Sequence, residues 1–181
     1  MGALTTEAHG ATATAAGARS AMSSQYLIFS LGKEMFGVAT LRVREIIEYG
    51  NITNVPMMPE YMQGVINLRG SVVPVVDLSA RFGRPATEIS RRTCIVILEV
   101  LAETETFVLG IIVDAVSAVR QIEASAIEAA PSFGTRMRAD FIEGMAKVNQ
   151  GFVILLNLAA VLSIDELAML QAGAQDAPVR L

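Results

Sequence analysis

The chain has 181 residues, of which 52% are apolar and 18% charged, so most of it must pack into the core of one sizeable domain or two small ones. Its formal net charge of −4, without a basic stripe, argues against a general nucleic-acid binder. No apolar run approaches the about 18 residues that a membrane span needs. The single cysteine, Cys94, excludes an internal disulfide and fits a reducing cytoplasm.

Both ends of the chain are predicted to be flexible tails. Residues 1–24 are rich in Ala, Thr, Gly and Ser, and they lack the basic start and continuous apolar segment of a secretory signal. The one histidine, His9, lies in this tail, where a lone histidine is far more often incidental than catalytic. Residues 172–181 form the second predicted tail.

From residue 25 onward, short β-rich runs separated by Gly, Pro and Asn dominate the pattern. Residues 25–31 and 34–40 flank Gly32-Lys33 and predict a hairpin, whereas 42–49 is ambiguous between strand and helix. Further strands are predicted at residues 64–70, 71–78, 94–100, 106–113, 115–122, 141–148 and 151–158.

Helical signals are few. Residues 164–171 predict a helix, because Ser163 is a plausible N-cap and acidic residues fill the first turn. Residues 77–82 predict one further helical turn, capped by Asp77.

An internal repeat organises these strands. Residues 61–78 align without gaps on residues 141–158 when the chain is shifted by 80 positions. An aromatic residue then falls on an aromatic one, Tyr61 on Phe141, and a glycine and four apolar positions also coincide. Any two pairs of apolar strands align to some degree, but this agreement in register favours a true duplication. It predicts two similar lobes of about five short strands each, closed into barrels that protect their edges. A second pair of matching segments lies at a slightly shorter offset: 37–46 and 110–119.

The two copies differ at the charged positions. Asp77 falls on Asn157, and either residue is able to cap the turn that follows, so a structural role is favoured for Asp77. Arg69 falls on Asn149, whereas Glu45 falls on an alanine. These two charges therefore belong to the first copy alone, which makes them candidates for function.

Arg69 has two readings. Next to a strand turn it is either simply exposed, which is the commonest fate of an arginine, or partly buried among valines and in need of a carboxylate. Glu45, in an apolar segment, is the predicted partner. A charge pair in an apolar surface suits recognition of another protein.

The sequence offers no support for catalysis. No nucleophile is paired with a base, no His, Cys and Asp residues have metal-ligand spacing, and no glycine-rich phosphate loop is present. Cys94 stands beside Ile95 in a predicted strand, where a buried structural thiol is expected rather than a reactive one.

The run GVINLRGSVVPVVDL at residues 64–78 resembles the signature of the CheW-like domain, found in bacterial chemotaxis coupling proteins and in the regulatory domain of the kinase CheA. The resemblance extends over roughly residues 25–170 and includes QYLIFSLGKEMFGV, LRVREIIEY, GIIVDAVSAV and FVILLNLAAVL in the same order. It implies an all-β fold of two SH3-like five-stranded β-barrel lobes in tandem, intertwined over residues 25–171, with short helical turns and a C-terminal helix.

The same resemblance implies a non-enzymatic adaptor without a cofactor. Its expected partners are the cytoplasmic tip of methyl-accepting chemotaxis receptors and the regulatory domain of CheA, with no nucleic acid and no direct membrane insertion. The expected location is the cytoplasm, at membrane receptor arrays. The receptor tip is expected in an apolar groove between the lobes, near the NLRG turn. Carried over by position, the receptor-binding candidates are Val43, Glu45, Gly64, Arg69, Ile95, Gly110 and Val119.

Two alternatives stay open. The same domain is also expected in chemosensory pathways for twitching or development. A purine-binding role is disfavoured, because aromatic residues make up only 6% of the chain and tryptophan is absent. The kinase-binding residues are not assigned, and the role of the loop at residues 132–140 is open.

Overall fold

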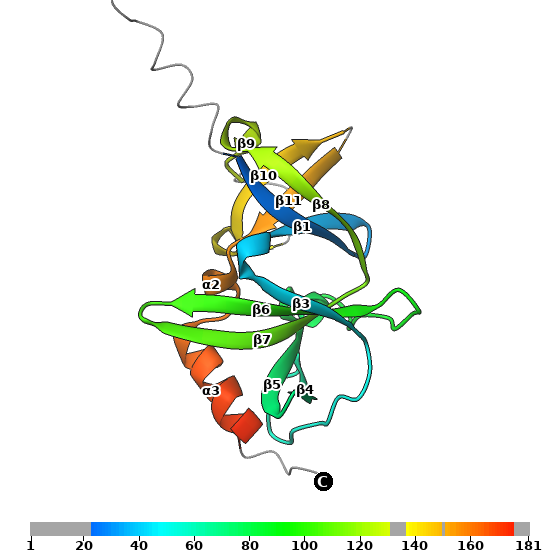
Figure 1. Ribbon diagram of the computed structural model, residues 1–181, viewed down its shortest axis with the longest axis vertical. Helices are drawn as coiled ribbons and strands as arrows, with labels where there is room; N and C mark the ends of the chain where they lie inside the picture. Colours follow the sequence, from blue (N-terminus) through cyan, green and yellow to red (C-terminus); the bar gives the residue numbers. More distant parts are fainter. Residues whose placement is uncertain (1–22, 131–136, 150, 176–181) are drawn as a thin grey trace, which may run out of the picture.

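The computed structural model describes residues 23–130, 137–149 and 151–175, which form two β-lobes stacked on each other (Figure 1). The all-β fold class predicted from the sequence is confirmed. The predicted tail up to residue 22, with His9, lies outside the described residues, as do 131–136 and 176–181.

Each lobe is built on one curled sheet. The six-stranded sheet has the order β8-β1-β2-β11-β10-β9, and the five-stranded sheet has the order β3-β6-β7-β5-β4. The strands of the first sheet are β1 (Ser23–Leu31), β2 (Glu34–Ala39), β8 (Ala115–Glu123), β9 (Ile127–Glu128), β10 (Ile142–Val148) and β11 (Gly151–Leu156). Those of the second are β3 (Val43–Glu48), β4 (Met62–Leu68), β5 (Ser71–Asp77), β6 (Cys94–Ala102) and β7 (Glu105–Val113).

Helices are short, apart from the last one. Helix α3 runs along one side of the lower lobe in Figure 1, and α2 lies between the lobes. The helical segments are η1 (Thr40–Arg42), α1 (Leu78–Arg81), η2 (Ala124–Ala126), η3 (Ala139–Phe141), α2 (Leu158–Val161) and α3 (Ile164–Gln175).

The structure resolves one ambiguous segment and moves the boundaries of both predicted tails. The ambiguous segment 42–49 contains strand β3. Strand β1 begins at Ser23, two residues inside the predicted tail. Helix α3 continues to Gln175, past the predicted tail start at residue 172, because Ala174 still packs in the core with only 2% of its surface exposed.

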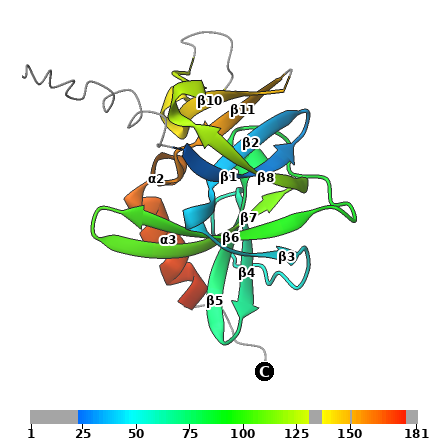
Figure 2. The ribbon, with the colours of Figure 1, turned by 45° about the horizontal axis from the view of Figure 1, so that its top comes forward.

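The two copies of the repeat exchange their first hairpins. Hairpin β1–β2, from the start of the chain, pairs with β8 and β11 of the second copy. Hairpin β6–β7 pairs with β3 and β5 of the first copy. Figure 2 shows the result by colour, because the blue hairpin β1–β2 lies between the yellow-green β8 and the orange β11. Each lobe therefore contains both halves of the chain.

Matched contacts confirm the duplication. The backbone N–H of Asp77 donates to the carbonyl of Tyr61 at 2.8 Å, and that of Asn157 donates to the carbonyl of Phe141 at 2.8 Å. The parallel pairings match as well, since Val75 lies opposite Gly110 in one lobe as Leu155 lies opposite Gly37 in the other.

The first strand of each copy is buried on both faces, which explains why the apolar runs do not alternate with polar residues. One face of β1 and of β6 packs into a core shared by the two lobes, and the other face packs inside a single lobe. The shared core includes Leu27, Phe29, Leu31, Val96, Leu98 and Val100.

The guanidinium of Arg81 contacts both copies of the repeat at their interface. The guanidinium of Arg81 lies 5.0 Å from the ring centroid of Tyr61 and 5.1 Å from that of Phe141. Its Nε donates to the carbonyl oxygen of Val161 at 2.7 Å, and its Nη2 donates to Glu166 Oε2 at 3.2 Å. Tyr61 and Phe141 are the matching aromatics of the repeat, so Arg81 contacts both copies at equivalent points.

Glu166 ties helix α3 to this interface. The Ser163 N–H donates to the Glu166 carboxylate at 2.7 Å and the Glu166 N–H donates to Ser163 Oγ at 3.2 Å, a capping box that confirms Ser163 as the N-cap. Burial acts to raise the pKa of Glu166, but the Ser163 hydrogen bond and the Arg81 charge outweigh it and lower that pKa. Burial, reinforced by the Glu166 charge, raises the pKa of the Tyr61 hydroxyl.

Asp77 is a structural cap, as predicted. Its buried carboxylate accepts hydrogen bonds from the N–H groups of Ser79, Ala80 and Thr87 and from the Thr87 hydroxyl. Asn157 occupies the equivalent N-cap position, before α2, but its side chain makes no capping hydrogen bond. Thr87, in the loop before β6, gives Asp77 two of its four donors.

Candidate protein-interaction site

The tip of the β4–β5 hairpin holds Arg69 in a strained backbone conformation. Leu68 pairs with Ser71, and the two turn residues, Arg69 and Gly70, have φ of 52° and 86°. Two positive φ values are typical of a type I′ turn, which favours Asn-Gly. The Asn67 Oδ1 accepts a hydrogen bond from the Gly70 N–H at 2.9 Å, and this bond closes the turn. A long charged side chain thus occupies a position better suited to asparagine or glycine.

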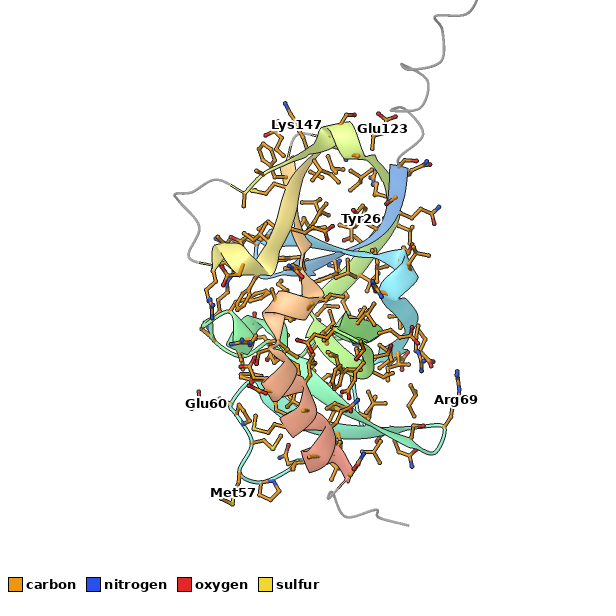
Figure 3. The ribbon with its side chains drawn as sticks, turned by 90° about the vertical axis from the view of Figure 1, so that its left-hand side faces the viewer. Tyr26, Met57, Glu60, Arg69, Glu123 and Lys147 are labelled. Atoms are coloured by element: carbon orange, nitrogen blue, oxygen red, sulfur yellow. The ribbon has the colours of Figure 1, made fainter. Side chains whose placement is uncertain are left out.

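Arg69 pairs with Glu45, as the sequence predicted. The distance between Arg69 Nη2 and Glu45 Oε2 is 3.1 Å. The Arg69 side chain is 80% exposed and that of Glu45 is 25% exposed, so the carboxylate is recessed and the guanidinium projects. Figure 3 shows Arg69 projecting from the hairpin tip, at the opposite end of the molecule from Lys147. An exposed pair contributes little to stability, which leaves most guanidinium donors free for a partner.

A bulge in β3 orients the charges beside this pair. The register between β3 and β6 shifts between Val43 and Glu45, which leaves Arg44 as the extra residue. Arg44 forms an ion pair with Glu99 of β6. Edge strand β3 therefore presents Arg44 and Glu45 side by side.

An open groove of about 480 Å³ lies between β3, the β4–β5 hairpin and the end of helix α3; we call it the hairpin groove. Its volume falls in the range of about 300–1,000 Å³ that is usual for binding sites. The wall that α3 provides consists of Gln171, Ala174 and Gln175. The remaining lining residues are Arg44, Glu45, Leu68, Arg69, Ser71, Val72, Val73, Pro74 and Val108.

A second groove, of about 660 Å³, lies between the lobes; we call it the interlobe groove. It is lined by Leu41, which is 92% exposed, and by Leu101, which is 47% exposed. Glu99 lines the interlobe groove and Arg44 lines the hairpin groove, so their ion pair joins the two depressions. The NLRG turn therefore borders the hairpin groove, beside the interlobe groove in which the receptor was expected.

Three of the predicted receptor-binding residues lie inside the lower lobe. Ile95 is fully buried, and a Cβ on Gly110 would lie 2.7 Å from the Ile95 side chain. Gly64 has φ of 143°, and a Cβ there would overlap the carbonyl oxygen of Thr53. These residues shape the lobe beneath the charge pair.

The other two predicted residues lie apart from each other. Val43 is half-buried on β3 and packs against the shared core, adjacent to the bulge. Val119 is 55% exposed on β8 of the other lobe and lines neither groove. The structure therefore brings Glu45 and Arg69 together, leaves Val43 on the same strand as Glu45 but outside both grooves, and leaves Val119 on the other lobe.

Sequence reasoning missed several lining residues. Arg44 lies between two predicted residues on β3, and a bulge there was the signal that would have placed it. Val72 lies on β5, just past the turn that holds Arg69, and strand alternation was the signal for it. Gln171 and Gln175 reach the groove through tertiary packing of α3, for which the sequence gives no local signal.

The described ranges contain no group of three or more His, Cys, Asp or Glu residues that could hold a metal ion. Within the same part of the chain, no helix is long and apolar enough to cross a membrane. Cys94 is half-buried, contrary to the expectation of a buried thiol, because it is the first residue of strand β6.

Comparisons with known proteins agree with one another. Residues 25–166 match the family model described as the CheW-like domain. The chain is 32% identical to a chemotaxis protein CheW from Klebsiella aerogenes over 148 residues, covering 82% of this chain and 87% of that protein. It is 34% identical to a probable chemotaxis protein CheW from Rhizobium etli over 143 residues, covering 78% and 89%. A solved structure, the scaffolding protein TtCheW from Thermoanaerobacter tengcongensis, matches with a TM-score of 0.71 and 34% identity, covering 80% of this chain and 91% of that one.

Proposed function

This chain belongs to the CheW-like domain family, and we propose that it is a non-enzymatic adaptor that couples methyl-accepting chemotaxis receptors to the histidine kinase CheA. Its place would be the cytoplasmic face of receptor arrays, reached through protein contacts. Relatives named as chemotaxis proteins and a solved relative named as a scaffolding protein support this role.

One observation carries the proposal for the receptor site: an exposed arginine in a left-handed turn, paired with a recessed glutamate beside a groove of mixed aliphatic and polar lining. Backbone strain of this kind clusters at binding and functional sites. Arginine beside aliphatic side chains is a common anchor in protein interfaces. The partner therefore meets Arg69 and Glu45 at its polar edge and Leu68, Val72 and Val108 in the groove.

The remaining candidates take different parts in this proposal. Gly64, Ile95 and Gly110 hold the hairpin and strand β3 in position from below, and Val43 anchors β3 beside the bulge. A contact between the receptor and Val119 stays a prediction, and it requires a partner that extends over both lobes.

The test is kinase activity reconstituted from receptor-containing membranes, CheA and this protein. Arg69→Glu places two carboxylates together, so we expect the concentration needed for half-maximal kinase activation to rise about tenfold or more. Asn149→Glu, at the equivalent turn of the other lobe, is the matched control and should activate like the wild type. Equal activation by Arg69→Glu, with its fold intact by circular dichroism, would remove Arg69 from the receptor site.

A further inference from the structure

The loop between β3 and β4 exposes a methionine in an uncommon backbone conformation. The Met57 side chain is fully exposed, and its backbone φ is 62°. Figure 3 shows this side chain projecting outward from the loop. A residue other than glycine is seldom found at positive φ. Packing in the core therefore does not account for this methionine, and its thioether is open to reagents in solution.

The next residue, Met58, attaches the loop to helix α3. A Cβ on Gly173 would lie 3.0 Å from both the sulfur and the terminal methyl carbon of Met58, so the thioether fills the space beside a residue without a side chain. Met58 also packs against the shared core, as Val55 does. Among the described residues, positions 54–58 form no hydrogen bond with another element of the fold. Apolar packing by Val55 and Met58 therefore holds this part of the loop in place.

The contact with Met58 lies on the helical turn that forms one wall of the hairpin groove. Gly173 lies midway between Gln171 and Gln175, which line that groove. Successive helical residues are rotated by about 100°, so Gly173 faces away from both glutamines. Met58 therefore supports this turn from the side opposite the groove, and loss of its contact would free the wall.

We propose that Met57 and Met58 are a peroxide-sensitive methionine pair, and that oxidation of Met58 releases the loop from helix α3. The thioether sulfur attacks one oxygen of hydrogen peroxide, so that an S–O bond forms and the O–O bond breaks. The proton of the attacked oxygen passes to the departing hydroxide, which leaves as water. The sulfur is oxidised by two electrons and the peroxide is reduced by two.

The two methionines differ in the consequence of this reaction. Met57 is fully exposed and reacts first, and its sulfoxide remains in water without disturbing a contact. Met58 is half-buried and reacts more slowly. Its sulfoxide is polar and carries an added oxygen, for which the close contact with Gly173 leaves no room.

The proposal is tested on the full chain by treatment with hydrogen peroxide, with peptide mass spectrometry and Tm measured over time. Met57 sulfoxide should form severalfold faster than Met58 sulfoxide, and Tm should fall by about 5 °C only as the second product accumulates. The amide NMR signal of Gly173 should shift in the same phase. A fall in Tm that follows Met57 oxidation, or an unchanged Gly173 signal when Met58 is oxidised, would overturn the proposal.

Two variants separate this contact from the other methionines of the chain. Met58→Leu keeps an apolar side chain of similar volume, so it should fold normally and should keep its Tm after peroxide treatment. Met57→Leu is the matched control and should lose Tm as the wild type does. A peroxide-treated Met58→Leu protein that loses as much Tm as the wild type would place the sensitive methionine elsewhere and overturn the proposal.

The effect on the hairpin groove rests on the proposed function and is tested with a synthetic helical hairpin that carries the cytoplasmic tip of a methyl-accepting chemotaxis receptor. The wild type with oxidised Met58 should bind this probe about threefold or more weakly, whereas treated Met58→Leu should bind as before. Equal affinity of the oxidised and reduced wild type would remove the link to the groove. If the probe binds neither form, the proposed function fails, and the Tm comparison still decides whether Met58 is the oxidation-sensitive contact.

Discussion

Arg69 and Asn149 occupy the same position in the two copies of the repeat, with φ of 52° and 56°. Asparagine tolerates this left-handed conformation well, whereas arginine has no local hydrogen bond to offset the strain. The lower lobe therefore gives up some stability at an exposed residue of its hairpin tip. That exchange of stability for an exposed guanidinium is the residue-scale signature of a recognition site.

Replacing Arg69 by asparagine, the residue at the equivalent turn of the second copy, separates the effect of Arg69 on stability from its effect on binding. Arg69→Asn should raise the free energy of unfolding by up to about 1 kcal/mol, because it relieves the backbone strain and loses only an exposed ion pair. The same variant should weaken binding to the receptor tip, because the guanidinium is lost. Urea unfolding and a binding titration measure the two effects. A variant that is less stable than the wild type would show that the Glu45 contact outweighs the strain.

Gly64 provides the opposite case, a residue of the signature whose role is internal. Gly64→Ala adds a methyl group that overlaps the Thr53 carbonyl at φ of 143°, so we expect a loss of about 3 kcal/mol or more in unfolding free energy. Gly144→Ala is the matched control, since its added methyl meets a side-chain methyl, Ile127 Cγ2, ahead of any backbone atom, and Gly144 lacks the left-handed φ of Gly64. It should cost clearly less in thermal unfolding. Similar losses for both variants would contradict this view of Gly64.

These residues show what the sequence could and could not predict about the site. The Glu45–Arg69 pair was predictable, because the second copy lacks both charges and so marks them as additions to the scaffold. Ile95 and Gly110 were assigned to the same surface by resemblance, although they lie in the core. A signature holds residues that build a fold together with residues that bind, and only burial separates the two.

Among the elements, helix α3 depends most on a titratable contact. Its first turn is held by the Glu166 carboxylate, which accepts hydrogen bonds from Ser163, Tyr61 and Arg81. The helix was predictable from its cap and acidic start, but its extension through Ala174 was not, since packing in the core decides it. The position of α3 in turn sets one wall of the hairpin groove.

The stability that Glu166 provides should depend on pH. The pKa of Glu166 is lowered from 4.5 in the folded protein, so its contribution is complete above that value and is lost as the pH falls through the folded pKa. Glu166→Gln should reduce the unfolding free energy by about 1–2 kcal/mol at pH 7. The difference should shrink toward zero in the acid range, as urea titrations of both proteins at several pH values would measure. A difference that stays constant with pH would contradict the charge-based account.

At the scale of the whole molecule, the exchange of hairpins decides how the chain folds. The repeat itself was predictable from the register of residues 61–78 and 141–158. The exchange could not be derived from strand patterns, because β1 and β6 are both apolar on two faces and suit either lobe equally well. The pairing of β1 with β8 instead of β3 is a long-range choice that tertiary packing makes.

The exchange predicts that neither half of the chain folds alone. A break within the segment between α1 and β6 separates β1–β5 from β6–β11, and it leaves β3 without β6 and β5 without β7. The hairpin β1–β2 then loses both of its neighbours in the upper sheet, β8 and β11. Each fragment should lack cooperative unfolding by circular dichroism, because a strand set without its central hairpin cannot bury its apolar faces.

An equimolar mixture of the two fragments should regain the native spectrum. Arg81→Met in the first fragment should weaken that assembly, since Arg81 contacts Tyr61 of one fragment and Phe141 and Glu166 of the other. If the first fragment folded as a stable monomer, its hairpin would have to close onto its own copy, and the exchange would then be a preference of the full chain instead of a requirement of its sheets.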